Sequence, residues 1–249
     1  MILYPAIGAG HPALVCALST RQGGVSSGNF GMNLSFAVGD EPAAVEENRR
    51  RFFGSIGVPM DSLVFQKQVH GDTVRHVRTA GTLDSTDGSC TSTPGVFLCV
   101  TIADCVPVFL FDPGVPAVGV VHAGWRGTVA GIVQKGVDVM VRDLGAVPSR
   151  MQAHIGPSAG VCCYTVGPEV VAGLPSSCVH ATDGGVMKAD LKEANRQELV
   201  LAGLPECGIT VDPACTICGS ALYHSHRRDG AGSGRMMGVI GLRSPVSVG

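Results

Sequence analysis

Residues 101–127, TIADCVPVFLFDPGVPAVGVVHAGWRG, carry the clearest structural signal in the chain. Two apolar runs flank the turn signal Asp112-Pro113-Gly114, so the segment predicts a β-hairpin. A two-residue turn at Pro113-Gly114 would place Cys105 opposite His122, and the nearby prolines can shift this register by one or two residues. In each of these registers a thiol and an imidazole lie at the same end of one hairpin.

Other apolar runs, bounded by Gly, Pro, Asp or Ser, predict further strands. Helical patterns also occur, one of them with Asp190 as N-cap and Glu193 in a variant of the capping box. Short turns between strands favour antiparallel pairing, and helices between groups of strands favour a mixed sheet covered by helices. We therefore expect an α+β fold in which residues 1–249 form a single domain. The expected strands are 13–18, 96–102, 106–111, 117–121, 151–155 and 237–242, and the expected helices are 41–53, 128–144 and 191–203.

The composition excludes several classes of function. Hydrophobic residues make up 45% of the chain and charged residues 15%, which suits a well-filled globular core. The formal net charge is -2 and no basic run occurs, so nucleic acid is not an expected partner. No stretch reaches the roughly 20 apolar residues of a membrane span, and the N-terminal segment lacks the basic start of a signal peptide. We expect a cytoplasmic protein without a membrane partner, whose ten cysteines are mostly free thiols.

The turn after His122 combines glycines with an arginine. Gly124 and Gly127 remove side chains from the backbone where the strand passes into a helix, which we expect to start at about Thr128. The first N–H groups of a helix are unpaired and favour an anion, and Arg126 adds a forked donor. We therefore predict an anion site with Arg126 as its charged side chain. Trp125, the single tryptophan, either stacks on a substrate or fills the gap between sheet and helix.

A second histidine motif lies in QKQVHGDTV, residues 66–74. Gln66, Gln68 and His70 alternate as one face of a strand would, with His70 at the strand end. Together with Cys105 and His122, His70 would complete a His2Cys set whose fourth position is open, as in catalytic zinc sites. The alternative is that the cysteine belongs to the core and that the histidines only cap strand ends.

Two further groups of polar residues have alternative interpretations. The glycine-rich loop TRQGGVSSGNFGMNLSFAVGD (20–40) contains Asn33, and the helix after it contains Arg49. These residues either serve as connectors or supply hydrogen bonds to a substrate. Near the C-terminus, Cys215, Cys218, His224 and His226 could form a second metal site, although five residues between the pairs is short for a zinc finger. Cys162 and Cys163, as neighbours on a strand, would face opposite ways and are expected to serve packing.

These motifs together resemble the YfiH family, also called the laccase-domain or multicopper-oxidase-like family. The resemblance covers about residues 17–242. It rests on the glycine-rich loop quoted above and on QVHGD, ADCVPV, HAGWRGTxxGI, GPxxGxCCYxVGPEV and CTxC…SHRRDGxxxGRMMxVI.

The resemblance implies two mixed sheets packed between helices and a zinc site at His70, Cys105 and His122, which are also the catalytic residues. It implies purine nucleosides and phosphate as substrates, with phosphorolysis of adenosine, inosine and methylthioadenosine and deamination of adenosine. Ser158 replaces a cysteine that many members have, and His224 replaces an aromatic residue. Both departures concern substrate preference.

These residues are compatible with three classes of enzyme. A nucleoside phosphorylase needs an anion site, for which Arg126, Arg49 and Arg227 are candidates. A metal-free amide hydrolase acting on a peptidoglycan precursor would use Cys105 as nucleophile and His122 as base. A copper-dependent polyphenol oxidase (laccase) is the least favoured, because a multicopper centre needs about ten histidines, largely in His-x-His pairs. The chain has eight histidines, with His224-Ser-His226 as the one such pair.

Overall fold

The expected hairpin is the centre of the computed structural model, which describes residues 1–245. Strand β8 (Val106–Asp112) pairs antiparallel with β9 (Ala117–Ala123). Asp112 faces Ala117, so the loop contains four residues and not two, and Pro107 rather than Cys105 faces His122. The longer loop follows from its chemistry: the Asp112 carboxylate accepts the Gly114 N–H at 2.7 Å, and two prolines in the loop cannot donate to the ladder.

The fold contains two six-stranded sheets, both of which mix parallel and antiparallel pairs, and the hairpin forms the centre of the second. The first contains, in spatial order, β1 (Ile2–Leu3), β2 (Leu14–Ser19), β14 (Met236–Leu242), β7 (Phe97–Ile102), β3 (Leu63–Gln66) and β5 (Gly81–Leu83). The second contains β13 (Ile209–Val211), β10 (Gln152–Ile155), β8, β9, β6 (Gly88–Thr91) and β4 (Val74–His76). A separate small sheet pairs β11 (Val179–Ala181) with β12 (Met187–Ala189).

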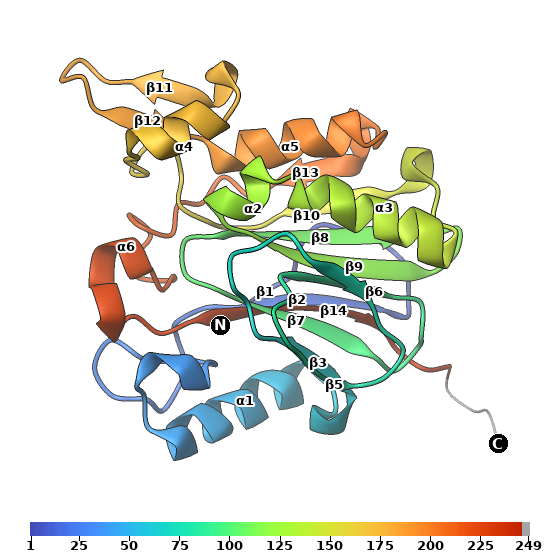
Figure 1. Cartoon of the computed structure of the whole chain (residues 1–249). Coiled ribbons are helices and arrows are strands. Elements are labelled where there is room, and N and C mark those ends of the chain that lie inside the picture. Colours follow the sequence, from blue (N-terminus) through green and yellow to red (C-terminus); the bar gives the residue numbers. More distant parts are fainter. Residues whose placement is uncertain (246–249) are drawn as a thin grey trace.

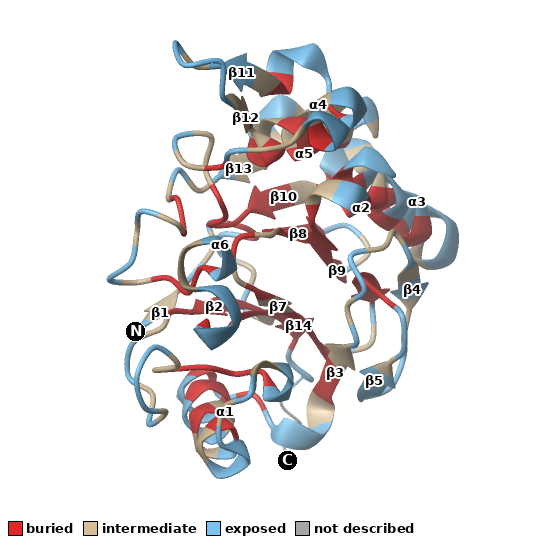
Figure 2. Ribbon diagram, turned by 60° about the vertical axis from the view of Figure 1, so that its left-hand side comes forward, coloured by how far each residue is buried: buried red, intermediate tan, exposed pale blue. Residues whose placement is uncertain are grey.

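The central strands are buried on both faces, as Figure 2 shows. In β8, Phe109 and Phe111 point into the core between the two sheets. Val108 and Leu110, on the other face of β8, pack beneath the helices. A strand covered on both sides needs apolar residues at every position, which explains the unbroken run VPVFLF.

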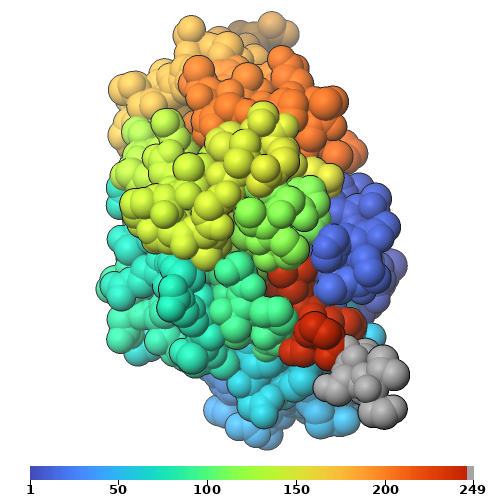
Figure 3. Space-filling model, turned by 90° about the vertical axis from the view of Figure 1, so that its right-hand side faces the viewer, coloured from blue at the N-terminus to red at the C-terminus, as the bar shows by residue number. Residues whose placement is uncertain are grey.

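Helices cover the outer faces of both sheets (Figure 1). α1 (Pro42–Ile56) buries Phe52 and Phe53 against the first sheet. α3 (Ile132–Leu144) and α5 (Leu191–Leu201) cover the second, and Figure 3 shows these helices and the α1 region at opposite ends of the molecule. Among residues 1–245 no helix is both long and apolar enough to cross a membrane. The shorter helices are α2 (Trp125–Val129), α4 (Pro168–Gly173) and α6 (His226–Asp229), with 3-10 turns at Phe36–Val38, Met60–Ser62, Pro148–Arg150, Ser176–Cys178, Glu206–Gly208 and Gly230–Gly232.

The expected α+β architecture of two packed mixed sheets with flanking helices is confirmed. All six expected strands form, and Asp190 caps α5 by accepting the Glu193 N–H at 3.0 Å. The expected helix 128–144 is wrong in two respects. It is divided, because Gly131 adopts the left-handed conformation (φ 72°), and its first part, α2, already begins at Trp125.

Candidate functional site

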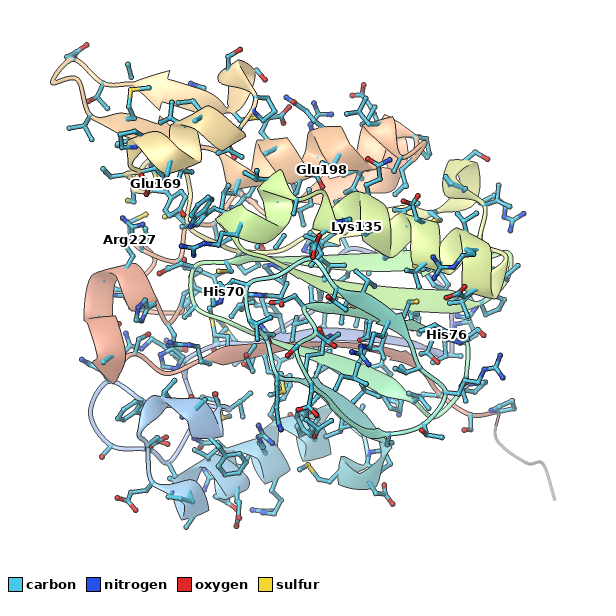
Figure 4. All side chains as sticks on the ribbon, viewed as in Figure 1. His70, His76, Lys135, Glu169, Glu198 and Arg227 are labelled. Carbon is cyan, nitrogen blue, oxygen red and sulfur yellow. The ribbon has the colours of Figure 1, made fainter. Side chains whose placement is uncertain are left out.

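Three side chains from separate segments meet at one end of the sandwich. Cys105 directly precedes β8, His122 belongs to β9, and His70 lies in the loop after β3 (Figure 4). One ligand atom of each lies within 4.8 Å of the others. The two imidazole rings are 5.0 Å apart between centroids. Two imidazole nitrogens and one thiolate are a donor set that fits Zn²⁺ with an open coordination position.

His70 reaches this position from a loop and not from a strand end. β3 ends at Gln66, and the Gln68 side chain then bonds the backbone of Thr101 through both its amide nitrogen and its oxygen, at 2.9 and 2.8 Å. His70 itself has φ 59°, in the left-handed region. The expected alternation of residues 66, 68 and 70 along one strand is therefore wrong, but the turn brings the His70 ring to the cluster.

Asp87 bonds both the loop that carries His70 and the ring of His122. Its fully buried carboxylate accepts the N–H groups of Val69, His70 and Gly71 at 3.1, 3.0 and 2.9 Å. It also bonds Nδ1 of His122 at 2.9 Å, which leaves Nε2 of that ring for the cluster. A carboxylate behind a ligating histidine fixes its tautomer and orientation. In the sequence, Asp87-Gly88 is typical of an ordinary turn and gives no signal of this role.

Cys105 and His122 form a coupled acid–base pair. Burial would raise the pKa of Cys105, but the His122 charge and hydrogen bonds from His122 and His70 lower it to about 6. Burial would lower the pKa of His122, but the Cys105 charge and the bond to Asp87 raise it to about 9. The metal-free pair is therefore a thiolate and an imidazolium at neutral pH, and the thiolate is the form that binds a metal or attacks an electrophile.

Two glycines allow this close packing. A Cβ at Gly124 would lie 3.1 Å from Cδ2 of His70 and 3.3 Å from Sγ of Cys105. A Cβ at Gly127 would lie 2.8 Å from the carbonyl oxygen of Gly71, so α2 could not approach the His70 loop. The glycines of the turn after His122 therefore make room for the site.

The cluster lies in the wall of a cavity of about 910 Å³, a size suited to a small-molecule ligand. Four arginines and Lys67 line it, against one carboxylate, Asp104. Among residues 1–245 none of the four arginines belongs to an ion pair, so their charge is not neutralised locally. The cavity is therefore electropositive. The arginines are Arg49, Arg126, Arg227 and Arg235, and aromatic lining residues are Phe36, Phe65, Trp125 and Tyr164.

Arg49 and Arg227, both expected at the site, are fixed in the wall of the cavity. The Arg49 guanidinium lies 4.5 and 4.4 Å from the ring centroids of Phe36 and Phe65, and its Nε donates to the Leu34 carbonyl. Arg227 belongs to α6, its side chain points toward α4 in Figure 4, and its guanidinium lies 5.1 Å from the Tyr164 ring centroid. Arg235 lies in the GRMM part of the C-terminal motif, but it is not among the arginines expected at the anion site.

Arg126 lies in the first turn of α2, because this helix begins at Trp125, three residues before the expected start at Thr128. Its side chain is exposed, and its guanidinium lies 4.5 Å from the Trp125 ring centroid. Trp125 packs against the core beneath the helices and also lines the cavity, so its position agrees with gap filling and leaves stacking on a substrate as a prediction.

Asn33 does not line the cavity. It is fully buried, and its amide donates to the Ser35 carbonyl and to Asp40 at 2.9 and 3.0 Å. Its oxygen accepts the Arg235 N–H at 2.9 Å. In the structure, Asn33 braces the loop and positions the backbone of Arg235.

Asp104 links the segment that carries Cys105 to α6 and to the loop before it. Its carboxylate accepts the Arg227 N–H at 2.6 Å and the Thr216 hydroxyl at 2.7 Å. Asp104 has φ 93°, a conformation that residues other than glycine rarely adopt, so the chain turns directly before Cys105 and β8. The sequence indicates Asp104 only as a neighbour of Cys105, since its two partners are more than 100 positions away.

The cysteines and histidines near the C-terminus do not form the second metal site that their sequence spacing suggested. Cys215 and Cys218 meet Cys162 and Cys163, not the two histidines. Cys162 and Cys163 lie in a turn, and Cys162 is exposed, so assigning this pair to strand packing was wrong. His224 is fully buried, and burial lowers its pKa to about 3. His226 lines the main cavity.

Comparison with known proteins gives consistent matches over most of the chain. A model of the family described as multi-copper polyphenol oxidoreductase laccase matches residues 15–243. Purine nucleoside phosphorylase YlmD of Geobacillus stearothermophilus is 40% identical over 92% of this chain and 90% of its own. A purine nucleoside phosphorylase of Deinococcus radiodurans is 39% identical over 96% and 93%.

Solved structures agree with these matches. The crystal structure of YlmD from Geobacillus stearothermophilus has a TM-score of 0.88 and 38% identity, covering 94% of this chain and 93% of that one. The crystal structure of the Bacillus licheniformis hypothetical protein YfiH has a TM-score of 0.87 and 37% identity, covering 92% and 93%.

Proposed function

The chain belongs to the multi-copper polyphenol oxidoreductase laccase family, that of YlmD and YfiH, and from this premise we propose that it is a zinc-dependent purine nucleoside phosphorylase. Its proposed substrates are phosphate with adenosine, inosine or methylthioadenosine, and it would also deaminate adenosine. The observation that carries the proposal is the convergence of His70, Cys105 and His122 in the wall of an electropositive, nucleoside-sized cavity.

The cavity contains separate groups of residues that could bind the phosphate and the base in phosphorolysis. Phosphate oxygen attacks C1′ of the ribose, the glycosidic bond breaks, and the base leaves with a proton. Arg126 and Arg227 would hold the phosphate, because forked guanidinium donors match its oxygens. Trp125 and Tyr164 offer aromatic faces to a base. Zinc held by His70, Cys105 and His122 would supply a Lewis acid and, for deamination, an activated water.

The test is product analysis with a matched inactive variant. Wild-type protein and Cys105→Ala, purified identically, are incubated with each nucleoside with and without phosphate. We expect phosphate-dependent release of free base and ribose 1-phosphate, and phosphate-independent conversion of adenosine to inosine, by the wild type alone. Equal base release by Cys105→Ala would indicate a contaminating enzyme and refute the assignment.

Metal analysis of the freshly purified protein distinguishes zinc from copper. We expect zinc at the His2Cys set, with loss of that metal in Cys105→Ala. Copper in its place, together with oxidation of a phenol that depends on Cys105, would replace this proposal by the polyphenol oxidase alternative.

One observation favours a second candidate, a metal-free amide hydrolase acting on a peptidoglycan precursor. Asp87, His122 and Cys105 form a chain of carboxylate, imidazolium and thiolate. The thiolate would add to the amide carbonyl, His122 would protonate the leaving amine, and water would hydrolyse the thioester. Amidase activity that survives a chelator but is lost on alkylation of Cys105 would support this candidate against the first.

A further inference from the structure

A second cluster of thiols lies outside the main cavity. Cys162, Cys163, Cys215 and Cys218 each place a sulfur within 4.8 Å of the other three. They come from two loops that are about 50 residues apart in the chain, one before α4 and one before α6. Four thiols, with no nitrogen or oxygen ligand in the group, are a donor set for a soft, tetrahedral metal.

The backbone around the cluster is arranged for this packing. Cys163 and Tyr164 both donate their N–H groups to the Gly160 carbonyl at 2.9 Å, so a tight turn carries the two adjacent cysteines. Neighbouring residues on a strand would face opposite ways, whereas this turn directs both to the cluster. A Cβ at Gly160 would lie 3.0 Å from Cβ of Cys215 and 3.4 Å from Sγ of Cys162, so only glycine leaves the room that the sulfurs occupy.

The surroundings also stabilise negative sulfur. The Gly160 N–H donates to Sγ of Cys215 at 3.2 Å. Backbone N–H donors to a ligating thiolate are the outer hydrogen bonds of metal sites. The buried Lys192 ammonium, fixed on the carbonyls of Asp212 and Ala214 at 2.6 Å, adds a positive charge near the cluster.

We propose that Cys162, Cys163, Cys215 and Cys218 bind one zinc ion as a closed tetrathiolate site, separate from His70, Cys105 and His122. Zinc–sulfur bonds of about 2.3 Å place sulfurs about 3.8 Å apart in a tetrahedron, so the cluster closes with a contraction of up to about 1 Å per pair. Binding releases the thiol protons and involves no change of oxidation state. Because all four positions are filled by protein, the site is structural and not catalytic.

The ion would fix one wall of the main cavity. Tyr164, which lines the cavity, directly follows Cys163. On the other loop, Arg228 of α6 donates to the carbonyls of Thr216 and Ile217 at 2.9 Å, and the Thr216 hydroxyl bonds Asp104. The cysteine loops are thus joined to the segments that carry Tyr164, Arg227 and Asp104. The tetrathiolate site ties these segments together.

The experiment measures bound zinc in a variant that lacks the site formed by His70, Cys105 and His122. Cys105→Ala protein is purified under reducing, anaerobic conditions, and zinc per chain is measured. We expect about one equivalent, which is lost when Cys162→Ser and Cys218→Ser are added. Both positions are exposed, so the substitutions leave the core intact. The control is Cys207→Ser in the same background, an exposed cysteine outside the cluster, which should retain the metal.

Two further measurements identify the ligands. Cobalt(II) added to the metal-free Cys105→Ala protein should give the intense sulfur-to-metal absorption of a tetrathiolate, and Cys162→Ser with Cys218→Ser should abolish it. A chelator should lower the Tm of the Cys105→Ala protein but not that of the serine variant. Unchanged zinc content in the serine variant overturns the proposal. A disulfide among the four cysteines in the reduced, anaerobic preparation, or bound iron with sulfide, also overturns it.

Discussion

The Asp87 carboxylate bonds Nδ1 of His122 at 2.9 Å, and both side chains are buried. The same carboxylate accepts three consecutive N–H groups of the loop that carries His70. One residue thus orients two members of the cluster, and its own pKa is held below the usual value despite burial, by His122 and the loop N–H groups.

Asp87→Asn should weaken metal binding at this cluster by about 10–100-fold, because the amide cannot accept all four hydrogen bonds. The donors left unpaired should also cost about 1–3 kcal/mol of stability. Competition with a chromophoric chelator and urea unfolding measure the two effects. The control is Asp84→Asn, which alters an exposed ion pair with Lys67 and should change neither by much. Metal affinity equal to wild type in Asp87→Asn would contradict the orienting role.

The contribution of the Cys105–His122 pair to the stability of the metal-free protein should depend on pH. The pKa of Cys105 is lowered to about 6, so its contribution to stability is lost as the pH falls through 6. The pKa of His122 is raised to about 9, so its contribution is lost as the pH rises through 9. The pair should therefore stabilise the metal-free protein most between these values.

Alkylation of Cys105 in chelator-treated protein checks this pair directly. Its rate should reach half its maximum near pH 6 in the wild type. In His122→Ala the midpoint should move up toward that of an ordinary thiol, because the neighbouring charge is lost. Identical midpoints in the two proteins would show that His122 does not control the thiol.

Gly124→Ala should impair the site without unfolding the protein. The backbone at Gly124 has φ -72°, which alanine tolerates, but the added Cβ would press on His70 and Cys105 at 3.1 and 3.3 Å. We expect weaker metal binding and lower activity. The matched control is Gly54→Ala in α1, where an added Cβ meets nothing within 4 Å. This substitution should stabilise the helix by up to about 1 kcal/mol, because alanine has a higher helix propensity than glycine. Normal metal content in Gly124→Ala would refute the steric argument.

Arg126→Lys should impair phosphorolysis more than deamination. Lysine keeps the charge but loses the planar fork that matches phosphate oxygens. We expect a higher KM for phosphate, with the phosphate-independent deamination of adenosine changed much less. Arg142→Lys, at an exposed position of α3, is the control. An unchanged KM and kcat for phosphate in Arg126→Lys would remove this residue from the anion site.

Cysteines of the site and of the core should respond oppositely to truncation. Cys105→Ala should abolish metal retention at the His2Cys cluster and activity while the fold remains intact. Cys178→Ala removes a fully buried thiol from the core beneath the helices and should cost roughly 1 kcal/mol of stability without abolishing activity. Thermal unfolding and metal analysis of both variants separate the two roles. Equal loss of activity in both would show that packing, not ligation, explains Cys105.

Local patterns were sufficient for elements that depend on local physics. The strands around residues 106–111 and 117–121 follow from apolar runs, and the α5 start follows from the Asp190 cap. The register of the hairpin was not predictable to the residue, because Asp112 and the loop prolines select a longer loop than the minimal turn. The break at Gly131 was also missed, since a single glycine is tolerated in many helices.

By itself, the sequence determined that the chain forms two-sided buried strands covered by helices, and that Cys105, His122 and Arg126 lie near one end of a hairpin. Residue type and short-range spacing are enough for this. Only the tertiary structure decided which distant groups complete each site: Asp87 behind His122, Arg235 in the cavity wall, and Cys162 with Cys218. The Asp87–His122 and Cys162–Cys218 partnerships join segments separated by 35 to more than 50 positions, and they depend on how the sheets stack and where the loops turn. No local pattern encodes that geometry.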